Sequence, residues 1–459
     1  MYIKIMNYKS INPFSGINNL EIDCWNDNEI ENSLKRSYLV RDSWQKTTLN
    51  NRCKLLKKAA NILRDQKEDL SKMMASEMGK LIDEAKAEVE KCAWVCEFYA
   101  LNAKSFLADK MIQSDASKSF ITYQPLGCVL AIMPWNFPLW QVFRFAAPAL
   151  VAGNVGLLKH AENVPKSALA IEKIFRDAGF PDGIFISMMI SRDDTAKVIA
   201  DPRVQAVTLT GSEIAGSKVA AIAGANLKKT VLELGGSDAF IVLDDCDLDE
   251  AVKVGVASRF LNAGQSCIAA KRFIVLDSIA DQFIPKFKEA VEHLKIGDPL
   301  DKSTNLPPMA RQDLRDELHQ QVQDSISQGA IPLCGCEIDQ NTHAGYPASI
   351  IDHVKPGMRA YKEELFGPVA IIIRAKNEDD AVRIANDSPY GLGGSVWTEN
   401  PYRGEDVARQ IQSGASFVNG IVKSDPRLPF GGVKKSGYGR ELSEIGIHEF
   451  MNIKTIWIK

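Results

Sequence analysis

Residues 204–236, VQAVTLTGSEIAGSKVAAIAGANLKKTVLELGG, contain one complete unit of the pattern that decides the fold. Residues 204–210 are a short apolar run of the kind that forms a buried parallel strand, and residues 229–234 are a second such run. Residues 213–224, between the two runs, are predicted to be a helix. A strand, a helix and a strand at this spacing predict a parallel βαβ unit.

The same alternation extends from this unit in both directions. Before it, we predict strands at 128–134, 155–159 and 183–190, and helices at 138–152 and 165–178. After it, we predict strands at 239–244, 272–277 and 369–375, and helices at 247–261, from 279 onward and at 311–328. Residues 28–105 have apolar residues at helical spacing and are predicted to be mostly helical. The two series predict an α/β protein with two doubly wound parallel-sheet domains that meet near Gly235–Gly236.

Composition narrows the classes of function. The 459 residues are too many for one ordinary domain. With 55 basic and 58 acidic residues the net charge is −3, which offers no electrostatic footprint for nucleic acid or an anionic membrane. No apolar run is long enough to span a bilayer, and the start, MYIKIMNYKS, lacks a signal-peptide core, so we expect a cytoplasmic protein. The nine scattered cysteines predict neither a disulfide framework nor a metal site.

Three side chains are candidates for catalysis. Cys267 ends the small-residue turn NAGQSC, where a thiol can be exposed near backbone N–H donors, although most cysteines taken blind are buried structural thiols. Glu233 begins ELGG at the end of a predicted strand and could deprotonate the thiol or a water. Asn136, in MPWNFPLW, could stabilise an oxyanion through its amide N–H, or it could simply be a turn residue.

The turn TGSEIAG (210–216) is a candidate phosphate site. It follows a predicted strand and begins a helix, so its free N–H groups and the helix dipole could bind phosphate. Alone this is a weak signal, because many α/β turns look the same.

Together these motifs resemble the aldehyde dehydrogenase superfamily. PWNFP, GS-x-x-x-G, ELGG, GQ-x-C, EELFGP (363–368) and PFGGVKKSG-x-GRE (429–441) occur in the order typical of that family. The resemblance begins near Asn12, and we expect the chain to lack the N-terminal strands that many members carry before this point. It implies that Cys267 attacks the aldehyde carbon, that Asn136 and the Cys267 N–H hold the oxyanion, and that Glu233 activates the water that hydrolyses the thioester.

The resemblance also implies the organisation of the chain. Residues 1–106 and 125–235 would form a Rossmann-like dinucleotide-binding domain, and residues 236–435 the catalytic domain. Residues 107–124 and 436–459 would form a small β extension for oligomerisation, in a homodimer or a homotetramer. The alternating tail 452–459 has no partner nearby in sequence, so it must pair with a distant strand or with another subunit.

Cofactor residues follow from the same resemblance. Lys159 and Glu162 would bind the adenosine ribose, and Glu364 the nicotinamide ribose. The remaining expected cofactor residues are Gly211 and Ser212 near the pyrophosphate, Gly216 for close helix packing, and Trp135 and Phe366 near the nicotinamide. A carboxylate at Glu162 would accept hydrogen bonds from ribose hydroxyls and repel a 2′-phosphate, so we expect NAD in preference to NADP, with NADP as the alternative.

The expected substrate is an aldehyde that carries a carboxylate. The text around several motifs is most similar to bacterial succinate-semialdehyde dehydrogenase, and Arg144, eight residues after Asn136, could bind the carboxylate bidentately. Arg144 could instead pair with an acid inside the protein. A second arginine that some of these enzymes carry is replaced by Leu261, and Arg259, Ser424 or Arg427 could compensate.

Three other functions stay open. A relative that passes its acyl group to CoA usually lacks the glutamate base, which is present here as Glu233. A catalytically silent structural relative would be expected to have lost one of the three catalytic side chains, and all three are present. The third alternative is a dehydrogenase for another small aldehyde.

Overall fold

The predicted βαβ unit forms as β8 (Val204–Thr210), α8 (Glu213–Ala225) and β9 (Lys229–Glu233) of a computed structural model that describes residues 7–459. Residues 1–6, which begin the predicted first domain and the segment MYIKIMNYKS, lie outside the described residues. β8 and β9 are parallel, with Thr210 opposite Glu233. The α/β class predicted from the sequence is confirmed.

A six-stranded sheet surrounds this unit in the order β19-β9-β8-β5-β6-β7. Its other strands are β5 (Cys128–Met133), β6 (Val155–His160), β7 (Phe185–Ser187) and the short antiparallel β19 (Gly437–Tyr438). The connecting helices are α5 (Trp140–Ala152), α6 (Pro165–Asp177) and α7 (Arg192–Ala200). β7 is much shorter than the predicted strand 183–190 because the chain leaves the sheet after Ser187.

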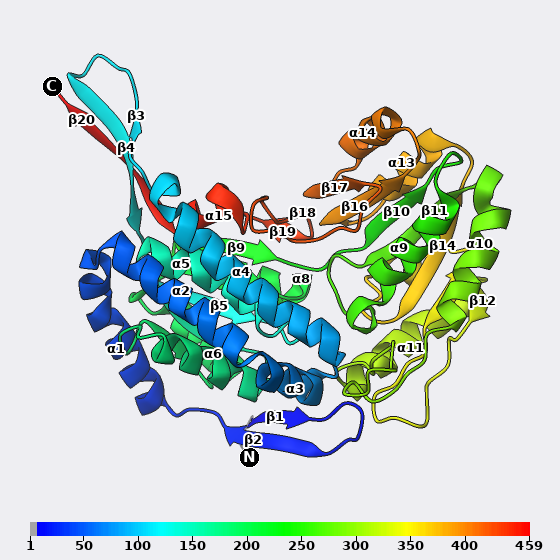
Figure 1. Ribbon diagram of the computed structural model, residues 1–459, viewed down its shortest axis with the longest axis horizontal. Helices are drawn as coiled ribbons and strands as arrows, with labels where there is room; N and C mark the ends of the chain where they lie inside the picture. The colour runs from blue at the N-terminus through cyan, green and yellow to red at the C-terminus, as the bar shows by residue number, and fades with distance from the viewer. Residues whose placement is uncertain (1–6) are drawn as a thin grey trace.

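The helical region 28–105 consists of α1 (Asp27–Lys46), α2 (Leu49–Asp65), α3 (Lys67–Met78) and α4 (Ile82–Phe106). Figure 1 shows these helices, drawn in blue, beside the sheet of the first half of the chain. α4 packs against both α2 and α5, and its buried residues belong to the same apolar core as β5, β6 and β8.

A second apolar core lies around a seven-stranded sheet of order β12-β13-β14-β11-β10-β16-β17. Its strands are β10 (Asp238–Val242), β11 (Ala270–Leu276), β12 (Ile331–Cys334), β13 (Ser349–Asp352), β14 (Val369–Ala375), β16 (Gly393–Trp397) and β17 (Ala415–Val418). Its helices are α9 (Leu248–Phe260), α10 (Asp277–Glu292), α11 (Gln312–Ser327), α12 (Arg359–Lys362), α13 (Glu378–Asn386) and α14 (Pro401–Gln410). All pairs except β12–β13 are parallel. The predicted domain boundaries themselves stay a prediction.

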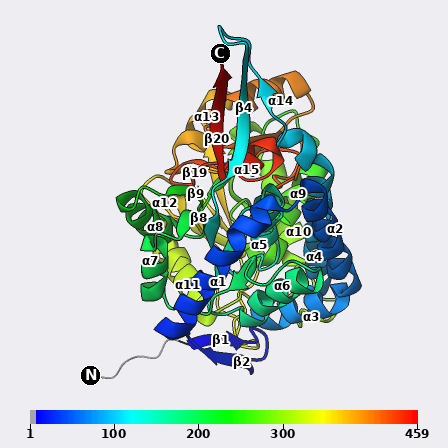
Figure 2. The same cartoon turned by 90° about the vertical axis from the view of Figure 1, so that its left-hand side faces the viewer.

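Three small β structures complete the chain. The tail β20 (Met451–Ile458) pairs antiparallel with β4 (Lys118–Pro125), which also pairs with β3 (Lys110–Met111), so its partner is a distant strand of the same chain. Figures 1 and 2 show this sheet projecting beyond the rest of the protein. β15 (Tyr390–Gly391) pairs with β18 (Val433–Lys434), and α15 (Ser443–His448) precedes the tail. The predicted homodimer or homotetramer stays a prediction.

The expectation that N-terminal strands are absent is wrong. β1 (Asn7–Ile11) forms a hairpin with β2 (Asn18–Asp23), and its loop is closed by the Asn12 Oδ1, which accepts hydrogen bonds from the N–H groups of Phe14 and Ser15. The buried Tyr8 and Ser10 alternate with more exposed neighbours, as a half-buried strand requires. Among the described residues, no helix has the length and apolarity to cross a membrane. The cytoplasmic location stays a prediction from the sequence.

Candidate active site

The candidate site lies where the strand order of the first sheet reverses direction. β6 and β7 follow on one side of β5, and β8 and β9 on the other. In open α/β sheets, ligands bind at the carboxyl ends of the strands beside such a switch point. Pro134–Asn136 follow β5 and Gly211–Ser212 follow β8, so both motifs lie at this edge.

The Cys267 turn has an unusual backbone that side-chain amides hold in place. After α9, the residues Asn262, Ala263 and Gly264 have φ values of 54°, 52° and 69°. A Cβ on Gly264 would lie 2.4 Å from the Gly367 carbonyl oxygen, so only glycine fits there. The Gln265 side chain accepts the Ala310 N–H at 2.9 Å and donates to the Asn262 carbonyl at 3.0 Å. These two hydrogen bonds therefore hold the turn that immediately precedes the Cys267 thiol.

Asn136 belongs to the same hydrogen-bond network. Its Nδ2 donates to the Gln265 carbonyl at 3.0 Å, and its own carbonyl accepts from Asn262 Nδ2 at 2.8 Å. One of its two amide N–H groups is used in this way, which leaves the other for a ligand. The structure thus joins the PWNFP turn to the cysteine turn across 129 residues of sequence.

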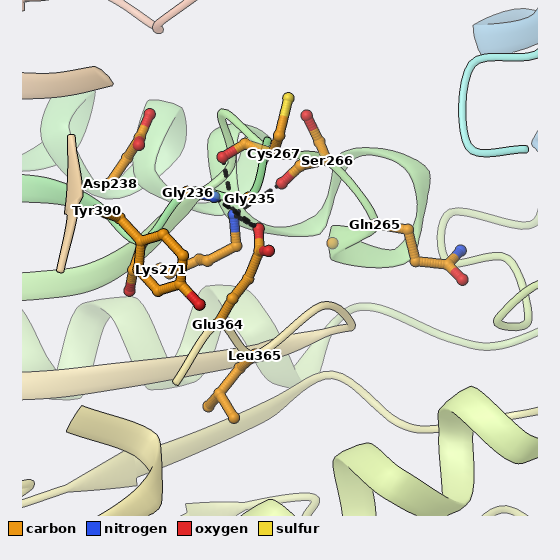
Figure 3. Close-up of polar contacts among 12 residues, drawn as sticks. Gly235, Gly236, Asp238, Gln265, Ser266, Cys267, Lys271, Glu364, Leu365 and Tyr390 are labelled. Carbon is orange, nitrogen blue, oxygen red and sulfur yellow. Dashed lines mark hydrogen bonds and ion pairs between the residues drawn. The ribbon is translucent and has the colours of Figure 1, made fainter. Parts of the chain in front are cut away.

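Lys271 is a buried cation beneath the cysteine turn. Its Nζ donates to the carbonyls of Ser266 and Cys267 at 2.8 and 2.9 Å, and it lies 3.0 Å from Glu364 Oε1. Figure 3 shows the ammonium group between the Glu364 carboxylate and these carbonyls, while the Cys267 sulfur points away from it. Glu364 also accepts the Gly236 N–H at 3.1 Å. One ion pair therefore connects the predicted ribose-binding carboxylate with the backbone of the predicted nucleophile.

Two cavities meet at Cys267. The larger, about 460 Å³, is lined by side chains and backbone of the cofactor motifs: Trp135, Asn136, Gly211, Ser212, Glu364 and Phe366. The smaller, about 120 Å³, is lined by apolar and aromatic residues such as Trp140, Leu261 and Phe430, and by polar residues that include Lys91, Arg144, Lys423 and Ser424. Cys267 lines both. The thiol is therefore placed to react with a molecule in the small cavity while a second molecule occupies the large one.

The environment of Cys267 opposes ionisation of the thiol. Burial raises the pKa of Cys267 to about 12, while the positive charges of Arg144 and Lys271 act in the opposite direction. At neutral pH the resting thiol is therefore protonated, and a reaction at sulfur requires a group that takes this proton.

Glu233 does not line either cavity. It ends β9 with both carboxylate oxygens buried and without hydrogen-bond partners, near Gly431 and Glu441. Burial, and then the charge of Glu441, raise the pKa of Glu233 well above its usual value. The structure thus brings Asn136 and Cys267 into one cavity lining but leaves Glu233 turned to one side.

Arg144 lines the small cavity, but its guanidinium group already interacts with other side chains of the protein. Its Nε is paired with the Glu441 carboxylate, its Nη2 donates to Thr210 Oγ1 at 3.3 Å, and its guanidinium lies 4.7 Å from the centre of the Phe430 ring. The guanidinium is therefore not free to bind a substrate carboxylate bidentately in this arrangement. Three residues were candidates to compensate for the arginine that Leu261 replaces. Ser424 lines the cavity, whereas Arg259 donates to backbone carbonyls such as that of Val369 at 2.7 Å, and Arg427 pairs with Asp425.

Most of the predicted cofactor residues line the large cavity or support it. The Trp135 and Phe366 rings meet edge to face with 5.8 Å between centroids. Ser212 caps α8 by accepting the Ala215 N–H, so the first turn of α8 faces the cavity. A Cβ on Gly216 would lie 2.6 Å from Leu234, so glycine there permits close packing of α8 against the strand end.

Lys159 and Glu162 lie apart from that cavity. They form an ion pair at 2.5 Å, and Arg192 lies 3.7 Å from Glu162. Although burial acts to raise it, the charge of Lys159 holds the pKa of Glu162 below its usual value. Glu162 lines a neighbouring cavity of about 570 Å³ together with Arg192 and Arg311. The carboxylate is thus ionised but paired with cations.

Comparison with known proteins identifies the family. The sequence profile of the aldehyde dehydrogenase family matches residues 4–456. The chain belongs to the aldehyde dehydrogenase family. It is therefore an oxidoreductase that oxidises an aldehyde with a nicotinamide dinucleotide.

Individual relatives cover nearly the whole chain. The chain is 49% identical to a probable succinate-semialdehyde dehydrogenase [NADP(+)] of Synechocystis sp., over 98% of this chain and 99% of that protein. It is 46% identical to a succinate-semialdehyde dehydrogenase [NADP(+)] of Mycobacterium avium, over 98% of this chain and 96% of that protein. A structure of succinic semialdehyde dehydrogenase from Streptococcus pyogenes in complex with NADP+ matches with a TM-score of 0.97 and 40% identity, over 98% and 99% of the two chains. NADP in these names gives no support to the expected preference for NAD.

Four polar side chains of the site were missed by the sequence reasoning. They are Lys91, Lys271, Gln265 and Glu441. Gln265 and Glu441 stand inside quoted motifs, GQ-x-C and GRE, so the motifs themselves were a signal. Lys91 lies in the middle of a long helix whose lysines look like ordinary solvated charges, and nothing in its local sequence distinguishes it.

Proposed function

We propose that the protein oxidises succinate semialdehyde to succinate, through a thioester on Cys267, with NADP as the hydride acceptor. The observation that carries the substrate is the small cavity beside Cys267, which three cationic residues, Lys91, Arg144 and Lys423, line together with aromatic and apolar residues. A cavity of about 120 Å³ has the volume of roughly four water molecules in the liquid, which suits a short linear aldehyde. The names of the relatives support the same substrate.

The residues of the chain divide the work as follows. The Cys267 thiol gives its proton to a water molecule of the cavity, and its sulfur attacks the aldehyde carbon to form a thiohemiacetal. The free N–H of Asn136 together with the Cys267 backbone N–H stabilises the oxyanion. The former aldehyde carbon then loses its hydrogen as a hydride, which leaves the thioester. An oxyanion donor of this kind typically contributes about 3–4 kcal/mol to the barrier. Glu233 takes a proton from the water that hydrolyses the thioester, which requires its side chain to turn from Glu441 toward the cavity. Closing the site against bulk water favours each of these electrostatic interactions.

The residues around the large cavity fit a nicotinamide dinucleotide. The first turn of α8, capped by Ser212, presents backbone N–H groups to a pyrophosphate, and Gly211 leaves room for it because a Cβ there would approach only Leu209, at 3.5 Å. Glu364 would bind ribose hydroxyls, and Trp135 and Phe366 would flank the nicotinamide. When bound, the dinucleotide supplies the hydride acceptor.

The choice between NADP and NAD depends on Glu162. Its carboxylate would repel a 2′-phosphate, but the ion pair with Lys159 and the nearby Arg192 offset that repulsion and supply positive charge of their own. NADP in the names of the relatives supports its use here. Glu162→Gln should raise the ratio of kcat/KM for NADP to kcat/KM for NAD, because the 2′-phosphate no longer meets a negative charge.

The experiment is a panel of aldehydes assayed with the purified protein and each dinucleotide. Succinate semialdehyde with NADP should give the highest kcat/KM. Butanal, which has the same chain length but no carboxylate, should be at least about tenfold poorer because the ammonium group of Lys91 stays unpaired. Equal efficiency with butanal would remove the substrate assignment. A higher efficiency with NAD than with NADP would remove the cofactor assignment.

A further inference from the structure

Lys91 reaches the small cavity from the middle of α4. Its Nζ donates to Ser424 Oγ at 2.8 Å and lies 4.2 Å from the centre of the Trp140 ring. Lys91, Ser424 and Trp140 line the cavity that also contains the Cys267 thiol. The lysine is therefore aimed at the same space as the nucleophile, although it is 176 residues away from it in the sequence.

The positive charge of Lys91 has no carboxylate partner among residues 7–459. The acids near it are engaged elsewhere: Glu88 pairs with Lys80, and Asp425 pairs with Arg427. Of the two other cations of the cavity, Arg144 is paired with Glu441, and Lys423 is exposed to solvent. Buried ammonium groups are almost always paired, so an unpaired one beside a reactive cavity indicates a place for an anion.

Ser424 has a hydrogen to offer to that anion. Its oxygen accepts hydrogen bonds from Lys91 Nζ at 2.8 Å and from Trp140 Nε1 at 3.1 Å, which occupy both of its lone pairs. The hydroxyl hydrogen must then point elsewhere, and the cavity is the space that the side chain lines. A hydroxyl donor thus stands directly beside an ammonium donor, as a carboxylate with two oxygens requires.

We propose that Lys91 and Ser424 bind the carboxylate of the substrate directly, while Arg144, held by Glu441, adds positive charge without being the principal contact. This inference rests on the proposed function, because it names the residues that recognise the carboxylate of the aldehyde. It places specificity on α4 and on the loop at 424, which lie outside the motifs that contain Asn136 and Cys267.

The test compares Lys91→Met and Lys91→Arg with the wild type on succinate semialdehyde and on butanal. A charge-assisted hydrogen bond is worth roughly 1.5–3 kcal/mol. In Lys91→Met the ratio of kcat/KM for succinate semialdehyde to that for butanal should therefore fall by about 10- to 100-fold, chiefly through KM, and Lys91→Arg should recover part of it. The matched control is Lys104→Met, an exposed lysine of the same helix, which should leave the ratio unchanged. Circular dichroism on each variant checks that it folds.

The pH dependence gives an independent readout. Burial, together with the nearby charge of Arg144, lowers the pKa of Lys91 to about 8, and the other groups that face it are Cys92, Glu88 and Asp425. The free lysine loses its proton as the pH rises through 8, so kcat/KM for succinate semialdehyde should fall relative to kcat/KM for butanal above that pH. Taking the ratio of the two substrates cancels the contribution of the Cys267 thiol. Lys91→Arg should remove this fall, because arginine keeps its charge.

The outcomes separate this inference from the proposed function. If the wild type shows no preference for succinate semialdehyde, the proposed function fails. If the wild type shows the preference and folded Lys91→Met retains it, the function stands and the role of Lys91 is overturned. If only an Arg144→Met variant loses the preference, the carboxylate is bound by the arginine, and the inference is again overturned.

Discussion

Lys271→Met tests whether one buried ion pair couples the cofactor site to the nucleophile. The ammonium group makes three contacts, with the carbonyls of Ser266 and Cys267 and with the carboxylate of Glu364. Methionine keeps most of the volume of the side chain and removes all three. Breaking a buried pair from one side costs about 3–5 kcal/mol. Glu364 can reduce this cost by taking up a proton, because burial already raises its pKa and Lys271 is the charge that opposes the rise.

The functional effects should appear in two separate measurements. The charge of Lys271 lowers the pKa of the Cys267 thiol by more than the charge of Glu364 raises it, so the thiol pKa should rise in the variant. The variant should therefore be alkylated by iodoacetamide more slowly at pH 8–9, by tenfold for each unit of that rise. A protonated Glu364 is a poorer acceptor for ribose hydroxyls, so KM for the dinucleotide should rise by about tenfold or more. Lys253→Met, at a lysine whose side chain is 75% exposed, is the control and should change neither. A folded Lys271→Met variant with unchanged alkylation rates and an unchanged KM for the dinucleotide would refute the coupling.

Three further results are expected. Cys267→Ala should abolish dehydrogenase turnover, and retained turnover would exclude the covalent route. In the wild type without cofactor, alkylation of Cys267 should keep increasing with pH through pH 10, since burial raises its pKa to about 12; a plateau near pH 8 would contradict this. Glu233→Gln should keep the initial burst of reduced dinucleotide and slow the steady state, and an equal fall of both would show that the assigned division of labour is wrong. Gly264→Ala should lower the free energy of unfolding by about 2–4 kcal/mol, measured by denaturant unfolding, because it combines a left-handed alanine with a clash against Gly367; an unchanged stability would mean that the turn can relax.

The sequence by itself predicted the α/β class, the main alternating strands and helices and the family, and each of these depends on local signals. A parallel strand buried on both faces must be a continuous apolar run, and the helix that returns the chain must follow it, so 204–236 predicts its own structure. Cys267 and Asn136 could be proposed as neighbours because both lie in motifs at the ends of strands or helices, where the topology brings such ends to one edge. The hairpin of β1 was missed because a five-residue strand carries little periodicity.

Only the tertiary structure decided which charges pair. Arg144 pairs with Glu441 from the far end of the chain, Lys91 donates to Ser424 across 333 residues, and Glu233 is buried near Glu441 without lining either cavity at Cys267. The partners in each case come from elements that are far apart in the sequence and pack together in the folded protein, and a long charged side chain can reach several of them. The spacing of residues along the chain indicates which face of a helix a residue occupies. It does not indicate which residue lies on the opposite wall of a cavity, because that depends on how the elements pack. The electrostatic energy of a buried charge depends on the groups that surround it in space.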